Sequence, residues 1–105
     1  MSQLTSSLQW KSLQNLYNGK MKSAHMRDLF KNENRYCEFN VRLDNLGITF
    51  DYSKNIIDGQ TMQMLFSLAQ AGEVKNWAKK IFSGEKINWT EKRAVLHSAL
   101  RNMSG

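Results

Sequence analysis

The pattern of hydrophobic and polar positions predicts a helix between Ser6 and Gly19. Ser6 with Gln9 three residues later forms a capping-box pair, which is typical of a helix start. Asn18 and Gly19 provide a matching stop. Between these signals the apolar residues recur every three or four positions, which is helical spacing: Trp10, Leu13, Leu16 and Tyr17.

The pattern changes period in the next part of the chain. A shorter helical segment starts at Ser23, and the polar run 31–34 ends it. Apolar and polar residues then alternate over 37–43 and again over 48–52, which is the two-residue repeat of a half-buried strand. The intervening residues 44–47 have turn chemistry, so the two runs predict a β-hairpin. A lone hairpin is marginal in water, so its apolar face must pack on helices or on more protein.

Three further helices are predicted in the second half. Asp58 is placed to cap the first of them, which ends around Gly72, and Gly84 is placed to stop the second in a left-handed conformation. The last helix starts near Asn88 or Thr90. The apolar residues expected to be buried are, helix by helix, Met62, Leu65, Phe66 and Ala69; Val74, Trp77, Ala78 and Ile81; and Val95, Leu96, Ala99 and Leu100.

These elements predict the α+β class, mostly helical with about five helices and one antiparallel β-hairpin. The sequence has no proline, internal repeat or linker-like tract, so one compact unit over residues 1–105 is expected. No apolar run reaches the roughly 20 residues that span a bilayer, and the first residues lack the pattern of a secretory signal. The single cysteine provides no disulfide framework, so we expect a cytoplasmic protein.

The net charge of +6 raises the question of a polyanionic partner. The basic residues are scattered along the chain, however, and Lys75, Lys79 and Lys80 lie opposite the apolar stripe of a predicted helix. A solvated helix face explains them, and no zinc-finger spacing, phosphate loop or aromatic RNA-binding motif accompanies them. Nucleic-acid binding is therefore not favoured.

One candidate anion site lies in the last predicted helix. Arg93, His97 and Arg101 recur every four residues, so a helix would place them on one face, where they can bind a sugar phosphate. Asn88 and Glu91 would form the capping box of that helix. We favour pairing with acidic groups over phosphate binding, because a phosphate site normally adds backbone N–H donors.

The remaining chemistry-bearing residues have structural explanations. His97 has no nucleophile near it in sequence, and His25 does not form metal-ligand spacing with it. Cys37 lies on the apolar side of the predicted first strand, which indicates a buried, inert thiol. Asn88-Trp89-Thr90 matches a glycosylation sequon by chance, given that no secretory signal precedes it. From the residues alone, no catalytic, cofactor-binding or metal-binding residue is predicted.

Two segments of the chain carry a family resemblance most strongly: Asp51-Tyr52-Ser53-Lys54-Asn55, and Phe82-Ser83-Gly84-Glu85-Lys86-Ile87-Asn88 continued by Thr90-Glu91, Arg93-Ala94-Val95-Leu96-His97 and Ala99-Leu100-Arg101. The second of them, in the last quarter of the chain, resembles the N-terminal signature of the glucose-6-phosphate isomerase family. Similarity to the family's opening segments extends to Trp10-Lys11-Ser12-Leu13 and Asp28-Leu29-Phe30, so it covers nearly the whole chain.

The resemblance implies an enzyme that interconverts glucose 6-phosphate and fructose 6-phosphate without a metal or organic cofactor. It implies ring opening by acid/base groups and proton transfer between C1 and C2 by a glutamate through an enediolate. The groups that do this come from α/β domains later in the family's chain, and none matches a position here. We therefore expect the N-terminal segment of a larger, homodimeric α/β sugar isomerase that does not bind membranes.

Two expectations and one alternative follow. The isolated 105-residue chain is expected to be inactive, and its uncovered apolar faces are expected to cause self-association or loose packing. The alternative from another class is a stand-alone basic module that binds an acidic protein or nucleic acid.

Overall fold

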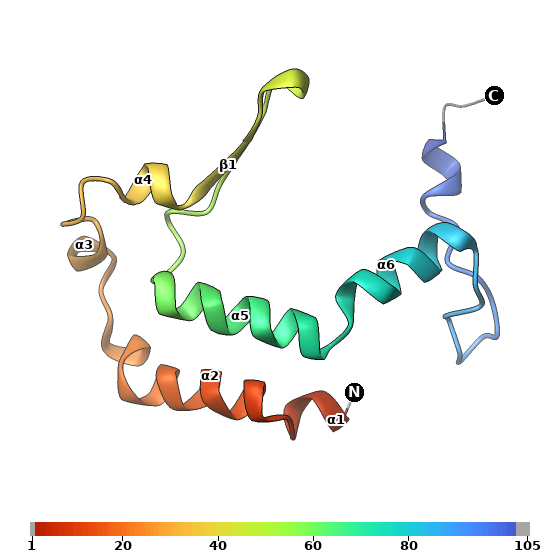
Figure 1. Cartoon of the computed structure of the whole chain (residues 1–105), viewed down its shortest axis with the longest axis horizontal. Coiled ribbons are helices and arrows are strands. Elements are labelled where there is room, and N and C mark those ends of the chain that lie inside the picture. The colour runs from red at the N-terminus through yellow and green to blue at the C-terminus, as the bar shows by residue number, and fades with distance from the viewer. Residues whose placement is uncertain (1, 103–105) are drawn as a thin grey trace. The chain divides into compact units, whose positions relative to one another are not determined.

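The computed structural model describes residues 2–102, and their contacts gather in two units, Met1–Ser67 and Leu68–Gly105. Six α-helices, three 3-10 helices (η) and one two-stranded antiparallel sheet lie in the described part, so the mostly helical α+β class is confirmed (Figure 1). The organisation of residues 1–105 as a single segment stays a prediction. The elements are α1 (Ser2–Thr5), α2 (Leu8–Gly19), η1 (Met21–Ser23), α3 (Met26–Leu29), α4 (Arg35–Glu38), β1 (Asn40–Leu43), η2 (Asp44–Leu46), β2 (Ile48–Asp51), α5 (Gly59–Ala71), α6 (Val74–Ser83) and η3 (Ala99–Arg101).

The first helix predicted from the sequence corresponds to α2, which begins one residue later than the capping signal at Ser6 predicts. The Ser7 hydroxyl oxygen accepts a hydrogen bond from the Trp10 N–H at 3.2 Å and is the N-cap. The Ser6 hydroxyl donates instead to the Gln3 carbonyl, because the preceding turn α1 uses that residue to close. The predicted segment from Ser23 likewise starts later: α3 begins at Met26, after a 3-10 turn.

The predicted hairpin is confirmed by β1 and β2. The two strands pair with Val41 opposite Phe50 and Leu43 opposite Ile48. Gly47 closes the turn with φ at 63°, the left-handed conformation that glycine adopts without a steric cost.

The prediction that the first strand begins at Cys37 is wrong. The Glu38 and Phe39 N–H groups bond to the Asn34 and Arg35 carbonyls, so the backbone forms the helical turn α4 there. Cys37 is consequently exposed, and the predicted buried thiol is also wrong.

The helix α5 starts as its cap predicts. Asp58 Oδ1 accepts from the Thr61 N–H at 2.8 Å and from the Thr61 hydroxyl at 2.7 Å. These bonds satisfy one of the N–H groups that a helix start leaves unpaired. The helix ends at Ala71, next to the predicted stop at Gly72.

In the second unit, α6 also ends as predicted. Gly84 has φ at 76°, its N–H bonds to the Ile81 carbonyl, and the Glu85 N–H bonds to the Lys80 carbonyl. This pair of bonds is a Schellman motif. The apolar stripe of α6 is nevertheless not buried: Val74 and Trp77 are exposed, so the expected burial of this stripe is wrong for these two residues.

The predicted final helix is wrong. Residues 88–93 form a turn closed by reciprocal backbone hydrogen bonds between Asn88 and Arg93, and up to residue 102 the only helical element that follows is the 3-10 helix η3. The capping interaction itself does form, since Asn88 Oδ1 accepts from the Glu91 N–H at 3.3 Å. Lys92 then takes a left-handed conformation with φ at 56°, which turns the backbone away from a helical path.

Candidate functional site

The candidate anion site is not assembled. Without a helix over 88–98, Arg93, His97 and Arg101 do not share a helix face, and all three side chains are exposed. Arg93 forms a salt bridge with Glu91 through both Nε and Nη2, so its charge is already paired. The predicted preference for acidic pairing in a larger protein over phosphate binding stays a prediction. His97 lies in the turn before η3, and Arg101 ends that 3-10 helix.

A buried polar site surrounds Arg35, a residue for which the sequence predicts no role. The Arg35 side chain is only 3% exposed. Its Nε donates to the Ser53 carbonyl and its Nη2 donates to the Asn55 carbonyl, each at 2.8 Å. The guanidinium carbon lies 4.4 Å from the centroid of the Phe39 ring and 5.4 Å from that of Phe30. We call these five residues the Arg35 cradle.

Several local features explain the cradle. Arg35 and Phe39 are four residues apart across α4, which brings them to one side of that turn. The Asp51 carboxylate accepts from the Ser53 N–H at 2.9 Å and fixes the loop that supplies the two carbonyls. The hydrogen bonds from Ser53 hold the pKa of Asp51 below its usual value. Arg35 at four-residue spacing from Phe39 was the available sequence signal.

The Arg35 cradle can position backbone but cannot do acid/base chemistry. A guanidinium keeps its proton at any physiological pH, so it neither accepts nor releases one during a reaction. Its planar fork does suit two carbonyl oxygens at once, and an ammonium group would not reproduce that geometry. In the described residues no buried side-chain nitrogen or oxygen lacks a hydrogen-bond partner.

A second polar contact joins the end of α2 to the start of α5. Lys20 Nζ lies 2.6 Å from Asp58 Oδ2, while the other carboxylate oxygen caps α5 through Thr61. Partial burial raises the pKa of Asp58, but the hydrogen bonds from Lys20 and Thr61 outweigh it and lower the pKa to about 2. The carboxylate is thus permanently ionised near neutral pH and serves as a cap.

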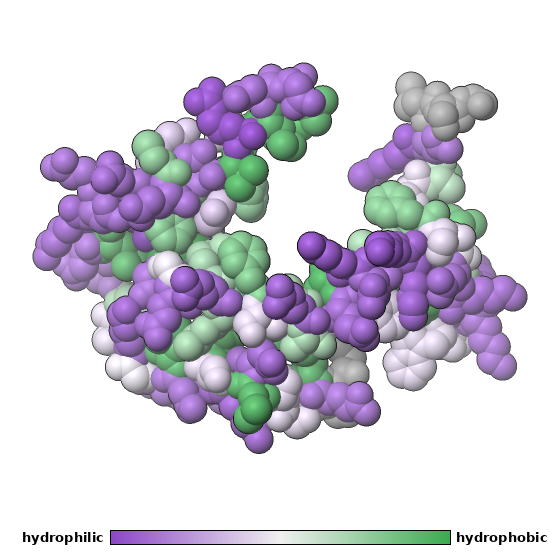
Figure 2. Space-filling model, viewed as in Figure 1, coloured by the Kyte–Doolittle hydropathy of each residue, from purple (hydrophilic) through white to green (hydrophobic). Residues whose placement is uncertain are grey.

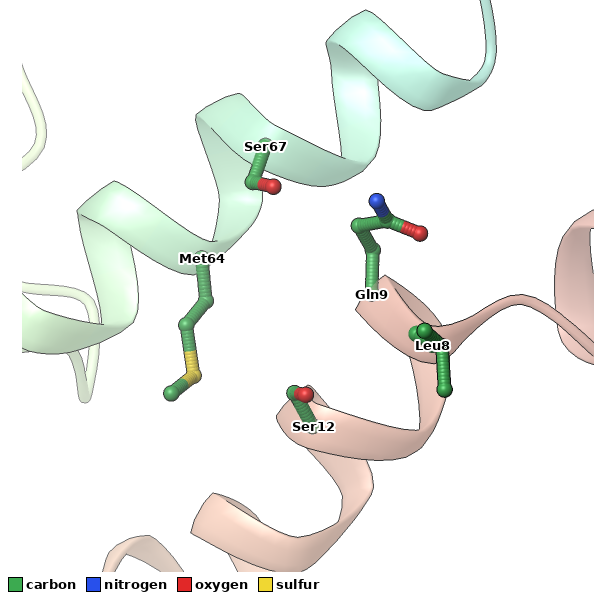
Figure 3. A pocket seen from close by; sticks show the side chains of 5 residues that line it. All are labelled: Leu8, Gln9, Ser12, Met64 and Ser67. Atoms are coloured by element: carbon green, nitrogen blue, oxygen red, sulfur yellow. The ribbon is translucent and has the colours of Figure 1, made fainter.

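A pocket of about 250 Å³ opens between α2 and α5 in the first unit (Figure 3). Its lining has two hydroxyls and one amide but no charged group: Leu8, Gln9, Ser12, Met64 and Ser67. In Figure 3 Met64 and Ser67 come from α5 and face the α2 side chains across the gap. Because its lining contains no cationic side chain, this pocket offers a sugar phosphate no charge-assisted hydrogen bond.

The other candidate residues have structural roles or none that the structure shows. His25 Nδ1 accepts from the Arg27 N–H at 3.1 Å and caps the short α3. Among residues 2–102 no three His, Cys, Asp or Glu side chains lie close enough to hold a metal ion. Within the same range no helix has the length and apolarity needed to cross a membrane.

Comparison with known proteins identifies the family. The family model described as phosphoglucose isomerase matches residues 51–105. The chain is 49% identical over 96 residues to glucose-6-phosphate isomerase 1 of Colwellia psychrerythraea, an alignment that covers 90% of this chain and 17% of that protein. It is 45% identical over 104 residues to the glucose-6-phosphate isomerase of Alteromonas mediterranea, an alignment that covers 99% of this chain and 19% of that protein. The glucose-6-phosphate isomerase of Helicobacter pylori is 47% identical over 85 residues, which cover 80% of this chain and 15% of that protein.

The matches therefore extend over nearly the whole chain, although the chain spans less than a fifth of the length of these relatives. The family model begins at Asp51, the last residue of β2, and includes both the loop that the Arg35 cradle holds and the turn at 88–93. The resemblance drawn from the sequence is confirmed, and the chain belongs to the phosphoglucose isomerase family.

Proposed function

We propose that this chain supplies the N-terminal helix-and-hairpin portion of a glucose-6-phosphate isomerase and carries none of the catalytic groups. The observation that carries the proposal is the match to relatives named glucose-6-phosphate isomerase over nearly the full chain. The whole enzyme would interconvert glucose 6-phosphate and fructose 6-phosphate in the cytoplasm, as a homodimer and without a cofactor. The proton transfer through an enediolate would use groups outside these 105 residues.

The described side chains support a scaffolding role. The groups with the chemistry of an acid, base or anion binder are either engaged locally, as Asp58, Arg93 and His25 are, or stand apart from one another. The buried guanidinium of Arg35 donates to two backbone carbonyls. We expect the base and the phosphate-binding groups that the whole enzyme needs to lie outside these 105 residues.

A replacement experiment tests the proposal. The matching 96-residue segment of the Colwellia psychrerythraea enzyme is exchanged for this chain, and fructose 6-phosphate turnover is followed by coupling glucose 6-phosphate to a dehydrogenase. The exchanged enzyme is expected to be active, and the 105-residue chain alone is expected to match a heat-killed control. Turnover by the chain alone, or a folded but inactive exchanged enzyme, would contradict the proposal.

A further inference from the structure

The hairpin has one apolar face. Because side chains alternate across a strand, Val41 and Leu43 point to the same side of β1 as Phe50 and Ile48 do on β2, and the register places them opposite one another. These four residues are 47–64% exposed. We call them the hairpin apolar face. The opposite side carries the polar pairs Asn40–Asp51 and Arg42–Thr49. Figure 2 shows hydrophobic side chains gathered along one side of the hairpin.

The base of the hairpin is firmly held, in contrast to its exposed face. The Tyr52 N–H donates to the Phe39 carbonyl at 3.0 Å, and the Tyr52 ring packs edge-on against Phe39 with 5.8 Å between centroids. Directly beyond Tyr52, the Arg35 cradle fixes the carbonyls of Ser53 and Asn55. The hairpin is therefore presented from an ordered base, with its apolar side chains open to a partner.

We propose that the hairpin apolar face docks on an apolar surface of the remaining isomerase polypeptide, an inference that rests on the proposed function. The relatives are more than five times as long as the aligned segment, so most of the apolar surface available to cover this face lies outside the chain. A cover within one larger fold also avoids the entropy cost of bringing two molecules together.

A second copy of the chain fits this face less well. The four side chains expose on the order of 400 Å², whereas each partner in a standard protein–protein interface buries about 800 Å². Homodimers through the hairpin apolar face alone would therefore be too weak to persist at micromolar concentration. The remaining polypeptide is the occupant that the size of the face favours.

The test uses two neighbouring positions on β2. Ile48→Lys places a charge in the hairpin apolar face, and Thr49→Lys places the same charge on the polar side of the same strand. Both residues are exposed in this chain, so neither substitution should change its denaturant midpoint appreciably. In the exchanged Colwellia enzyme, Ile48→Lys should lower Tm by about 3 °C or more, whereas Thr49→Lys should lower it by less than about 1 °C.

The outcomes are separable. Equal Tm losses for the two variants in the exchanged enzyme would overturn the inference. So would a stable dimer of the isolated chain that Ile48→Lys dissociates, because the occupant would then be a second copy. If the exchanged enzyme folds with these Tm differences but is inactive, the docking inference stands while the proposed function fails. If the exchanged enzyme does not fold, this chain is instead tagged and co-expressed with the remaining part of the Colwellia enzyme. Ile48→Lys must then lose the co-purified partner that Thr49→Lys retains.

Discussion

The two units differ in how their residues are held. The buried residues of the described structure, Met21, Arg35, Phe39, Ser53 and Thr61, all lie in the first unit. There, residues distant in sequence are joined, as Arg35 is to Asn55 across twenty positions. The second unit is organised by neighbouring residues, through the Gly84 stop and the turn at 88–93. The segment that most strongly identifies the family is therefore the one with the least tertiary support of its own.

Breaking the Arg35 cradle should lower the stability of the first unit more than any other substitution proposed below. Arg35→Ala leaves the Ser53 and Asn55 carbonyls without their donors and removes the guanidinium from two aromatic rings. We expect the free energy of unfolding of the first unit to fall by about 3 kcal/mol. Urea unfolding followed by near-ultraviolet circular dichroism measures it.

Two variants control this experiment. Arg42→Ala removes an exposed arginine of the hairpin and should change the free energy of unfolding by less than about 0.5 kcal/mol. Arg35→Lys keeps the charge but not the fork, so it should restore only part of the loss. Equal losses for Arg35→Ala and Arg42→Ala would show that the cradle does not organise the first unit.

Removing the cap of α5 should have the next largest effect. Asp58→Ala deletes two hydrogen bonds from Thr61 and the contact with Lys20, and should cost about 1–2 kcal/mol. Asp28→Ala is the matched control, because Asp28 forms only an exposed pair with Lys31. Thermal unfolding by far-ultraviolet circular dichroism compares them, and similar Tm values for the two variants would refute the expected difference.

In the second unit, Gly84→Ala should lower the stability of α6 at its C-terminal end. A Cβ at Gly84 meets no atom within 4 Å, so the cost is the left-handed backbone alone, about 1 kcal/mol. Gly19→Ala is the control, since Gly19 also has open space but no positive φ, and there alanine should be neutral or stabilising. Helicity and Tm are the measurements, and a loss at Gly19 as large as that at Gly84 would contradict this account.

Local signals in the sequence predicted much of the fold. The Asp58 cap, the Gly84 stop and the alternation of Val41 and Leu43 each depend on a few neighbouring residues, and each is confirmed. The failures arose where a local signal has two outcomes. Asn88 Oδ1 accepts from the Glu91 N–H in the turn as it would at a helix start. The Asn88 N–H bonds to the Arg93 carbonyl, however, so the second bond of a capping box does not form.

The site around Arg35 could not be predicted from local sequence signals. The hydrogen-bond partners of Arg35 are the backbone carbonyls of Ser53 and Asn55. Every residue has a backbone carbonyl, so residue types do not reveal which carbonyls an arginine will bind. Cys37 was misplaced because α4 ends at Glu38, immediately before the alternating run becomes a strand. The absence of an assembled anion site at Arg93 followed from the fold and not from residue types.

The last prediction concerns pH. The folded pKa of Asp58, about 2, lies below its ordinary value near 3.9, so the unfolded state binds the proton more tightly. The stability that this carboxylate contributes is thus fully present above about pH 5 and is lost as the pH falls through 4 toward 2. Plotted against pH, the difference in free energy of unfolding between the wild type and Asp58→Asn should shrink over this window. A difference that stays constant from pH 6 to pH 2.5 would mean that the Lys20 and Thr61 contacts do not favour the ionised form.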